Sequence, residues 1–442
     1  MLKTFTLGGV HPPENKISAT SKIVEMHTPK NVVVPLVQHL GAPAKSIVAK
    51  GDIVKTGQLI AQSSGFVSAN IHSPVSGKVL KIDKALNSSG YKSDAIFITV
   101  EGDEWVDNID RTDKLINEIK FSKQEIISKI ADAGIVGLGG ATFPSHVKTT
   151  LPKGKKADYL IINGVECEPY LTADHLLMLE KTEELFVGTE LLMKALDVSK
   201  AIIGIENNKS DAIKKMQEVS KKFNSISVQP LKVKYPQGGE KQLIEAITKR
   251  KVPSGGLPID IGAVVFNVGS VYAIYEAVQK NKPLIDRIVT VTGKTLKSPS
   301  NFKVKIGTMI GELIDMAGGL PEDTGKIING GPMMGKSVAS TEIPIVKGSS
   351  GILIMPENES KRKETEPCIR CSKCVGVCPM GLEPYLLSAL GEKSLFDRLE
   401  SDKVMDCIEC GSCSYVCPSG RPLLDYIRFG KTNVGKIIRS RK

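Results

Sequence analysis

The sequence of 442 residues predicts a multidomain α/β protein that ends in a small, helical, cysteine-rich domain. Three observations carry this prediction. The length allows roughly three domains, each with a core of its own. Apolar strands alternate with amphipathic helices between about residues 125 and 285. Eight of the nine cysteines lie between residues 368 and 417. The composition, 41% hydrophobic and 24% charged, is ordinary for a globular protein.

Residues 31–84 are typical of short strands separated by turns. The stretches VAKGDIVKTGQLIAQ and NIHSPVSGKVLKID resemble the two halves of a biotinyl- or lipoyl-type barrel-sandwich domain. Carrier domains of that type have a lysine at the tip of the hairpin between the halves, and here Phe66 falls near that point. We therefore expect residues 1–110 to form a barrel-sandwich scaffold or docking domain without a swinging arm, in which His72 is structural.

Residues 111–285 are expected to form an α/β core of the nucleotide-binding type. Residues 158–164 and 200–206 predict buried strands. Residues 183–196 and 240–249 predict amphipathic helices.

The part that follows the core, residues 286–355, is expected to be a third domain. Its stretch 287–320 predicts strand, turn, strand and helix, and resembles the β-grasp domain that binds soluble ligands. A charged stretch, PENESKRKETEP, then predicts a linker into a last domain, residues 356–442.

The cysteines of the last domain occur in two copies of one pattern, C-x2-C-x2-C-x3-C-P, as CIRCSKCVGVCP (368–379) and CIECGSCSYVCP (407–418). In this pattern three cysteines hold one [4Fe–4S] cluster and the fourth holds the other cluster. One predicted ligand set is Cys368, Cys371, Cys374 and Cys417. The second predicted set is Cys407, Cys410, Cys413 and Cys378.

Other uses of these cysteines fit the spacing less well. Structural zinc usually takes two well-separated pairs, not four cysteines within eleven residues. Disulfides are disfavoured because the first residues do not resemble a signal peptide. We therefore expect an intracellular 2[4Fe–4S] ferredoxin-like domain, and leucines at helical spacing between residues 383 and 406 predict that it is largely helical.

The core contains a glycine-rich stretch, GLGGATFPSHVK (137–148). Glycines let backbone N–H groups come close to a ligand. Lys148 is placed to begin a helix, where the helix N-terminus and the ammonium would both favour an anion such as phosphate. An ordinary tight turn is the alternative.

Together with NGVECEP (163–169), this stretch resembles the flavin site of the NADH-binding subunit of respiratory complex I. The resemblance implies that the loop and lysine surround an FMN phosphate and that two asparagines lie beside the flavin. It also implies that a phenylalanine and two acidic residues line an NADH pocket. The matching flavin-side residues are Gly137, Gly139, Gly140, Lys148, Asn163 and Asn267. The matching NADH-side residues are Phe143, Glu166 and Glu168.

At four positions this sequence differs from the motifs of the complex I family. Val165 stands where the family has aspartate, Leu138 where it has arginine, Cys167 where it has a small residue, and Thr142 where it has glycine. FMN binding is therefore better supported than the details of the nicotinamide pocket. The stretch YPQGGEKQLI (235–244) is expected to cover the same pocket.

The whole chain resembles the C subunit of the Rnf complex, an ion-translocating ferredoxin:NAD oxidoreductase. The opening TFTLGGVHPPENK, the barrel-sandwich domain without lysine, the flavin-type core, the β-grasp domain and the paired cysteine motifs occur in that order. This implies a peripheral subunit on the cytoplasmic side of the membrane. It would exchange electrons between NAD(H), FMN and two [4Fe–4S] clusters, with membrane subunits and a ferredoxin-linked redox subunit as partners.

Two rival functions share these features. A cobalamin reductase of the microcompartment type has the same core, β-grasp domain and paired clusters. An electron-relay or docking subunit without flavin is the other rival, and flavin content separates it from both enzymes. In either enzyme the flavin converts two-electron hydride exchange into one-electron steps, so no side chain needs to act as a general base.

Charge and hydropathy restrict the partners further. The net charge of +11 suits an acidic or anionic partner. Aromatic residues make up only 5% and no nucleic-acid module is present, so we expect no nucleic-acid partner. Residues 421–442 carry seven basic residues against one acidic, which predicts either contact with a membrane surface or a solvated basic tail. No apolar run is long enough to span a membrane.

Overall fold

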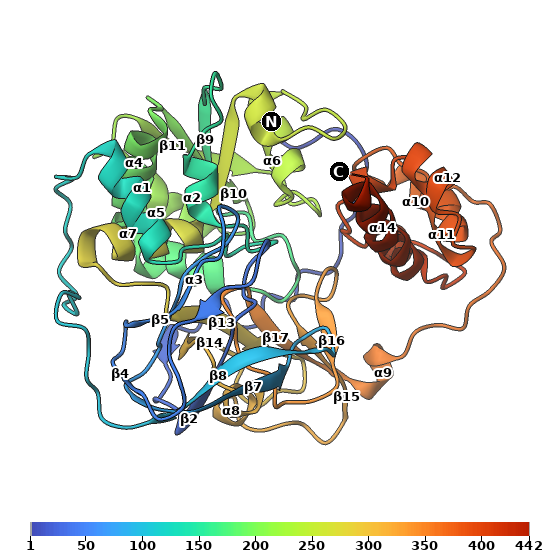
Figure 1. Cartoon of the computed structure of the whole chain (residues 1–442). Helices are drawn as coiled ribbons and strands as arrows, with labels where there is room; N and C mark the ends of the chain where they lie inside the picture. Colours follow the sequence, from blue (N-terminus) through green and yellow to red (C-terminus); the bar gives the residue numbers. More distant parts are fainter. Residues whose placement is uncertain (1, 442) are drawn as a thin grey trace.

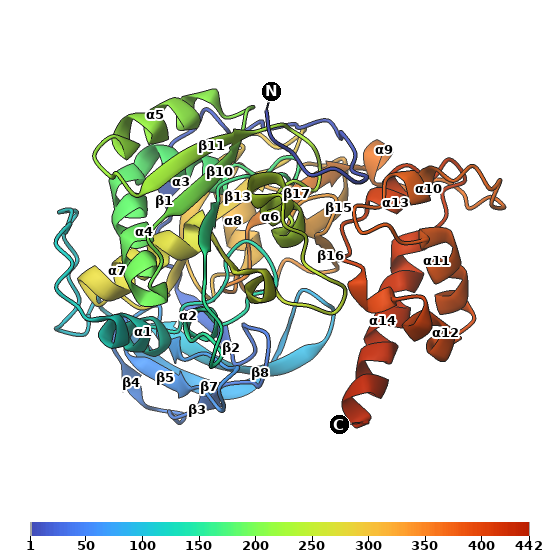
Figure 2. The same ribbon diagram turned by 90° about the horizontal axis from the view of Figure 1, so that it is seen from above.

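A computed structural model describes residues 2–441. The α/β core, the barrel-sandwich domain and the β-grasp domain lie together, and the C-terminal helical domain sits to one side of them (Figures 1 and 2). The predicted boundary after residue 110 falls in a segment without helix or strand. The boundary after 285 directly precedes β13, and that after 355 cuts off the last residue of β17.

The core is built on a parallel four-stranded sheet of order β11-β10-β9-β12. Its strands are β9 (Tyr159–Asn163), β10 (Ala201–Glu206), β11 (Ile226–Leu231) and β12 (Ala263–Asn267). The chain runs from β9 outward to β11, then returns to place β12 on the other side of β9. The point where the strand order reverses therefore lies between β9 and β12, and ligands of open α/β sheets bind at the carboxyl ends of such strands.

Alternate side chains of these strands enter two separate cores, as the two-residue period of a strand requires. Leu160, Ile162 and Phe266 pack toward α1 (Lys123–Asp132), α4 (Thr182–Leu196) and α7 (Val268–Lys280). Ile161 and Val265 pack against α6 (Glu240–Thr248) on the opposite face. The other core helices are α2 (Ser145–Thr149), α3 (Ala173–Glu180), α5 (Ser210–Ser220) and the short η1 (Pro258–Ile261). The strands and helices predicted from sequence in this region are present.

The barrel-sandwich domain consists of two small antiparallel sheets around one apolar core. One sheet contains β2 (Asn31–Pro35), β8 (Lys92–Val100), β7 (Gly77–Leu86) and β4 (Ile53–Val54). The other contains β3 (Lys45–Ser46), β5 (Leu59–Gln62) and β6 (Ile71–His72). Phe66 lies in the turn between β5 and β6, and its carbonyl accepts a hydrogen bond from His146 of α2 (3.0 Å). The tip of the hairpin therefore contacts the helix that follows the glycine loop.

The β-grasp domain holds a six-stranded mixed sheet of order β1-β14-β13-β17-β15-β16. Its later strands and helix are β13 (Asp286–Thr292), β14 (Ser300–Lys305), α8 (Ile310–Met316), β15 (Thr324–Asn329), β16 (Lys336–Val338) and β17 (Gly351–Pro356). The edge strand β1 (Ile23–Glu25) pairs in parallel with β14 although it comes from the start of the chain. Residues 23–25 are therefore part of the β-grasp sheet, although the sequence analysis placed them within the barrel-sandwich domain, residues 1–110.

The segment before β1, residues 3–16, runs along the core and is called here the N-terminal strap. Val10 forms a backbone bridge with Tyr235, and Gly9 N–H donates to the Val377 carbonyl of the C-terminal domain (2.9 Å). A Cβ at Gly8, whose φ is +65°, would lie 2.5 Å from that carbonyl oxygen, so glycine is required for this close approach. The strap thus links the core to the C-terminal domain.

The C-terminal domain is helical, as predicted. After α9 (Glu357–Ser360) comes an exposed segment, residues 361–372. The helices are α10 (Lys373–Gly376), α11 (Pro384–Glu392), α12 (Phe396–Ser401), η2 (Val404–Asp406), α13 (Ser412–Tyr415) and α14 (Leu423–Ser440).

The basic stretch 421–442 is not a free tail over its described part. It forms α14, whose apolar residues pack in the same core as those of α11. Four cations of this stretch are paired with acids of the same domain: Arg421 with Glu392, Arg428 and Lys431 with Glu409, and Arg441 with Glu400. Pairing leaves less free charge for a membrane surface than the sequence suggests. Among residues 2–441, no helix is long and apolar enough to cross a membrane.

Candidate flavin and iron–sulfur site

The glycine loop lies beside the carboxyl end of the core sheet. Leu138 anchors the loop to the rest of the protein through two hydrogen bonds. Leu138 is buried, its N–H donates to the Ser270 hydroxyl (2.9 Å), and its carbonyl accepts from Arg287 (3.1 Å). Gly139 and Gly140 are exposed or nearly so. A Cβ at Gly139 would lie 2.6 Å from Nδ2 of Asn267, so only glycine allows this approach.

The rest of the loop is closed by its own backbone. Gly137 N–H donates to the Phe143 carbonyl (2.8 Å), and Phe143 itself is half-buried. Thr142, which stands where the resembling family has glycine, has a φ of +54°. The departure in sequence is therefore accommodated with a glycine-type backbone conformation.

The two predicted asparagines are direct neighbours. Asn163 ends β9 and Asn267 ends β12, and the two residues are partners in the parallel register. The Asn163 amide donates to the Gly238 carbonyl (2.9 Å), and the Asn267 amide donates to the Asp174 carboxylate (2.7 Å). The structure thus places side by side two asparagines that the sequence analysis named and that lie more than one hundred positions apart in the chain. They lie at the edge of the sheet where the strand order reverses.

Lys148 lies near this edge, but not at the start of a helix as the sequence predicted. Helix α2 begins at Ser145, so Lys148 falls in its last turn. Its ammonium donates to the carboxylate of Glu240, the first residue of α6 (2.8 Å), and to the Val265 carbonyl (3.0 Å). The lysine can supply a positive charge to an anion from this position.

The two predicted acidic residues have structural partners. The Glu166 carboxylate accepts the backbone N–H groups of Asp174 (2.8 Å) and His175 (3.2 Å), which cap the start of α3. The Glu168 carboxylate accepts the N–H groups of Met333 (3.1 Å) and Met334 (2.8 Å) from the β-grasp domain. Both carboxylates are engaged within the protein, so their contact with NADH stays a prediction.

Burial changes the acidity of the groups in this region. It raises the pKa of Glu168 to about 7 against the opposing effect of its two N–H donors. Burial, with Glu166 nearby, raises the pKa of Asp174 to about 7. Asp174 can therefore hold a proton near neutral pH, one hydrogen bond away from Asn267.

Two residues organise the site in a way that the sequence did not predict: Lys16 was missed, and Tyr235 was named only as the first residue of the stretch 235–244. Lys16 of the strap is half-buried. Its ammonium donates to the carbonyls of Glu166 (2.8 Å), Glu168 (2.9 Å) and Leu171 (2.6 Å), and desolvation of the ammonium lowers its pKa to about 8. Tyr235 is 2% exposed and contacts both Glu168 and the C-terminal domain. The strap and these residues also line a cavity of about 240 Å³, together with Cys167 and Glu206. No local pattern signals contacts that span 150 residues or more of chain.

The two cysteine loops have the same backbone shape. In each loop two residues between the cysteines adopt positive φ: Arg370 (55°) and Ser372 (56°) in the first, Glu409 (57°) and Gly411 (78°) in the second. Alternation of right- and left-handed residues turns successive N–H groups inward, which is the geometry of many iron–sulfur and phosphate sites. Three of these four positions are not glycine, so the shape is imposed on them by the fold.

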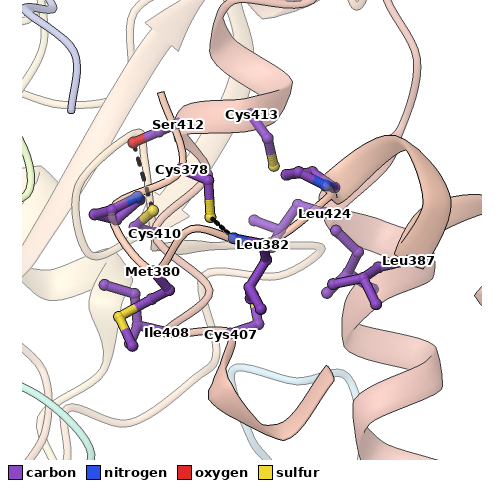
Figure 3. Close-up of a pocket in the computed structure, with 14 residues that line it drawn as sticks. Cys378, Met380, Leu382, Leu387, Cys407, Ile408, Cys410, Ser412, Cys413 and Leu424 are labelled. Carbon is purple, nitrogen blue, oxygen red and sulfur yellow. Dashed lines mark hydrogen bonds between the residues drawn. The ribbon is translucent and has the colours of Figure 1, made fainter. Parts of the chain in front are cut away.

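One predicted ligand set surrounds a single pocket. Cys378, Cys407, Cys410 and Cys413 all line it, with apolar residues, Gly411 and Ser412 making up the remainder (Figure 3). Backbone N–H groups reach two of the sulfurs, from Leu382 to Cys378 (3.3 Å) and from Glu409 to Cys407 (3.4 Å). We call these four residues the inner cysteines. A thiol set with apolar walls and N–H donors fits a [4Fe–4S] cluster.

The other predicted set lies nearer the surface, and we call it the outer cysteines. Cys368 and Cys371 are exposed, and Cys374 and Cys417 are half-buried. Burial, with the Cys417 thiol nearby, raises the pKa of Cys374, so these two cysteines of different motifs are neighbours. The crossed ligand sets expected from the spacing stay a prediction.

Burial disfavours the ionised form of the inner thiols. It raises the pKa of Cys407 to about 11 and of Cys413 to about 12, so without iron these thiols are protonated at neutral pH. Iron coordination must release those protons. Among residues 2–441, no three histidine, cysteine or acidic side chains gather closely enough to hold a single metal ion.

Four family models match consecutive parts of the chain. They are the RnfC barrel sandwich hybrid domain (residues 4–103), the Nuo51 FMN-binding domain (130–276), the SLBB domain (288–337) and the 4Fe-4S dicluster domain (360–418). The last match includes all eight cysteines of the two repeated motifs.

Curated relatives match nearly the full length. The C subunit of the proton-translocating ferredoxin:NAD(+) oxidoreductase complex of Clostridium ljungdahlii is 48% identical, over 98% of this chain and 94% of that protein. The chain belongs to the family of Rnf complex C subunits. The C subunit of the Na(+)-translocating complex of Acetobacterium woodii is 44% identical, over 97% of this chain and 96% of its own. The C subunit of the ion-translocating oxidoreductase complex of Rhodobacter capsulatus is 40% identical, over 88% of this chain and 75% of its own. The family expected from the sequence is confirmed.

A solved structure shares the fold of this Rnf family member. The crystal structure of an NAD+-reducing [NiFe]-hydrogenase in the H2-reduced state superposes with a TM-score of 0.52 and 17% identity, over 71% of this chain and 63% of the hydrogenase chain. At this identity the likeness shows the fold alone.

The Lys148→Met variant is expected to retain FMN about tenfold less tightly, because it removes one charged hydrogen-bond donor. FMN content after gel filtration, measured by absorbance and by release in acid, checks this. Lys155→Met is the matched control, since Lys155 pairs with Asp260 at an exposed position. Equal FMN content in both variants would remove Lys148 from the flavin site.

The Cys378→Ala variant is expected to lose the inner cluster and about half of the bound iron, because it removes one of four ligands. Iron content and the EPR spectrum of the reduced protein measure the loss. Cys167→Ala is the control, because Cys167 lies outside both cysteine loops and accepts a hydrogen bond from Gly238 (3.3 Å). Loss of iron in the control, or full iron in Cys378→Ala, would contradict the assigned ligand sets.

Proposed function

We propose that this chain is the peripheral subunit of an ion-translocating ferredoxin:NAD(+) oxidoreductase complex, exchanging electrons between NAD(H), FMN and two [4Fe–4S] clusters. One observation carries the proposal. The turn that accepts the Asn163 amide at Gly238 also contacts the loop of the inner cysteines, through Tyr235 and the Cys410 carbonyl (2.8 Å). A flavin site and a cluster site on either side of one short segment would suit electron transfer between them.

FMN supplies the conversion between the two-electron chemistry of nicotinamide and the one-electron chemistry of the clusters. The chain supplies binding and orientation. Gly137, Gly139 and Gly140 give a loop that approaches a ligand closely, and Lys148 gives a positive charge for the phosphate. Asn163 and Asn267 offer amides at the carboxyl edge of the sheet, and Asp174 holds a proton at its carboxyl group next to Asn267.

NAD(H) is expected at the same carboxyl edge of the core sheet as the FMN. Phe143 would shape the pocket for the nicotinamide, and Glu166 and Glu168 border it through the loop that Lys16 fixes. In this arrangement the acidic residues act mainly by holding the loop, because their oxygens already accept backbone N–H groups.

The two clusters differ in surroundings, and this suits a relay. Cys410 of the inner set packs against Val10 and Tyr235, while two of the outer cysteines are exposed. Electrons from the flavin would reach the inner cluster first and leave through the outer cluster to a redox partner. Two of the relatives carry different coupling ions in their names, which favours a role for this chain in the electron path rather than in ion selection.

The protein is proposed to sit on membrane subunits at the cytoplasmic side. Two observations support a peripheral position: family membership, and the lack of any membrane-spanning helix among residues 2–441. The barrel-sandwich domain, which has no lysine at its hairpin tip, serves as scaffold or docking surface.

The anaerobically purified protein should respond to NADH in two stages. The flavin absorbance should bleach, and the broad cluster absorbance should follow, because electrons reach the clusters through the flavin. Titration with NADH in the visible range measures both. A cluster spectrum without flavin and without response to NADH would contradict the proposal and leave an electron-relay role.

A further inference from the structure

The turn at residues 235–238 is held at both ends. At one end Gly238 accepts the Asn163 amide (2.9 Å) and its N–H donates to Cys167 Sγ (3.3 Å). At the other end the backbone of Tyr235 exchanges two hydrogen bonds with Val10 of the strap, at 2.8 and 2.9 Å. The turn is therefore fixed relative to the candidate flavin site before any contact with the cysteine domain is counted.

The Tyr235 side chain extends this fixed turn to the inner cysteines. Its hydroxyl donates to the Cys410 carbonyl at 2.8 Å, while the Glu168 carboxylate lies farther away, at 3.5 Å. A phenol has one proton to donate, so the shorter contact is the hydrogen bond. Tyr235 and Cys410 are buried in one apolar cluster with Val10, where a hydrogen bond is electrostatically stronger than in water.

A donor at this carbonyl affects the cluster in two ways. It holds the loop of Cys410 against the core, and it places the positive end of the O–H dipole beside a centre that gains negative charge on reduction. Hydrogen bonds and burial around a cluster are among the factors that set its reduction potential. Within residues 2–441, the Tyr235 hydroxyl contacts Glu168 and Cys410 and none of the outer cysteines.

We propose that Tyr235 is a positioning residue for electron transfer, whose hydroxyl holds the inner cluster against the flavin site and raises its reduction potential. The inference rests on the proposed function for the identity of the electron donor. When bound, FMN and the inner cluster would supply the one-electron exchange. Tyr235 keeps its proton, no bond to it forms or breaks, and it is neither oxidised nor reduced.

The test is the Tyr235→Phe variant of the full chain with its clusters. Midpoint potentials of both clusters are measured by EPR during titration with dithionite and redox mediators. We expect unchanged iron content, a lower midpoint potential for the inner cluster and an unchanged potential for the outer cluster. After mixing with NADH, flavin bleaching should keep its rate and cluster bleaching should slow, because a lower potential of the inner cluster reduces the driving force for its reduction.

A matched control is Tyr385→Phe, because Tyr385 is an exposed tyrosine of the cysteine domain whose hydroxyl contacts Glu383 (3.4 Å). It should leave the potential of the inner cluster unchanged. An inner-cluster potential that is the same in Tyr235→Phe as in the unaltered protein would overturn the proposal. Because the mediators reduce the clusters without NADH or FMN, this outcome is distinct from failure of the proposed function.

If Tyr235→Phe loses iron, a second substitution keeps the test decisive. A fluorinated tyrosine introduced at position 235 keeps the ring and the hydroxyl and makes the hydroxyl a stronger donor. The inner-cluster potential should then rise above that of the unaltered protein. An equal or lower potential would overturn the proposal.

Discussion

The structure depends on one buried junction, where Glu168 and Tyr235 of the core meet two other domains. The Glu168 carboxylate accepts two N–H groups of the β-grasp domain, and the Tyr235 hydroxyl donates to the Cys410 carbonyl of the cysteine domain. A buried carboxylate costs free energy unless it is hydrogen-bonded, so this junction specifies one arrangement of the domains. The strap adds Lys16, which fixes the loop that carries Glu168.

This junction explains why the inner and outer cysteines differ. Docking of the second cysteine loop against the core buries Cys410, while Cys413 is buried in the core of the cysteine domain itself and Cys368 and Cys371 lie at the surface. A cluster held by the inner cysteines would be shielded from water, and one held by the outer cysteines would be accessible to a partner. The contact between the two domains thus places the inner cysteines nearer the core than Cys368 and Cys371.

Features that depend on short stretches of sequence were predictable. Strand and helix periodicity indicated β9, β10, α4 and α6, and the spacing of the cysteines indicated the 4Fe-4S dicluster domain. Contacts between distant segments were not predictable. The strap carries no periodic pattern, and Lys16 and Tyr235 act through partners at least 150 residues away. The predicted position of Lys148 at a helix start was wrong because α2 begins earlier, directly after Pro144.

The central claim is that the inner cluster lies between the flavin site and the outer cluster. The most direct measurement uses the Cys413→Ala variant, which keeps all four outer cysteines, and follows the EPR signal of the outer cluster. We expect dithionite to reduce the outer cluster in this variant, whereas NADH should bleach the flavin and leave the outer cluster oxidised. Reduction of the outer cluster by NADH at the rate of the unaltered protein would contradict the claim.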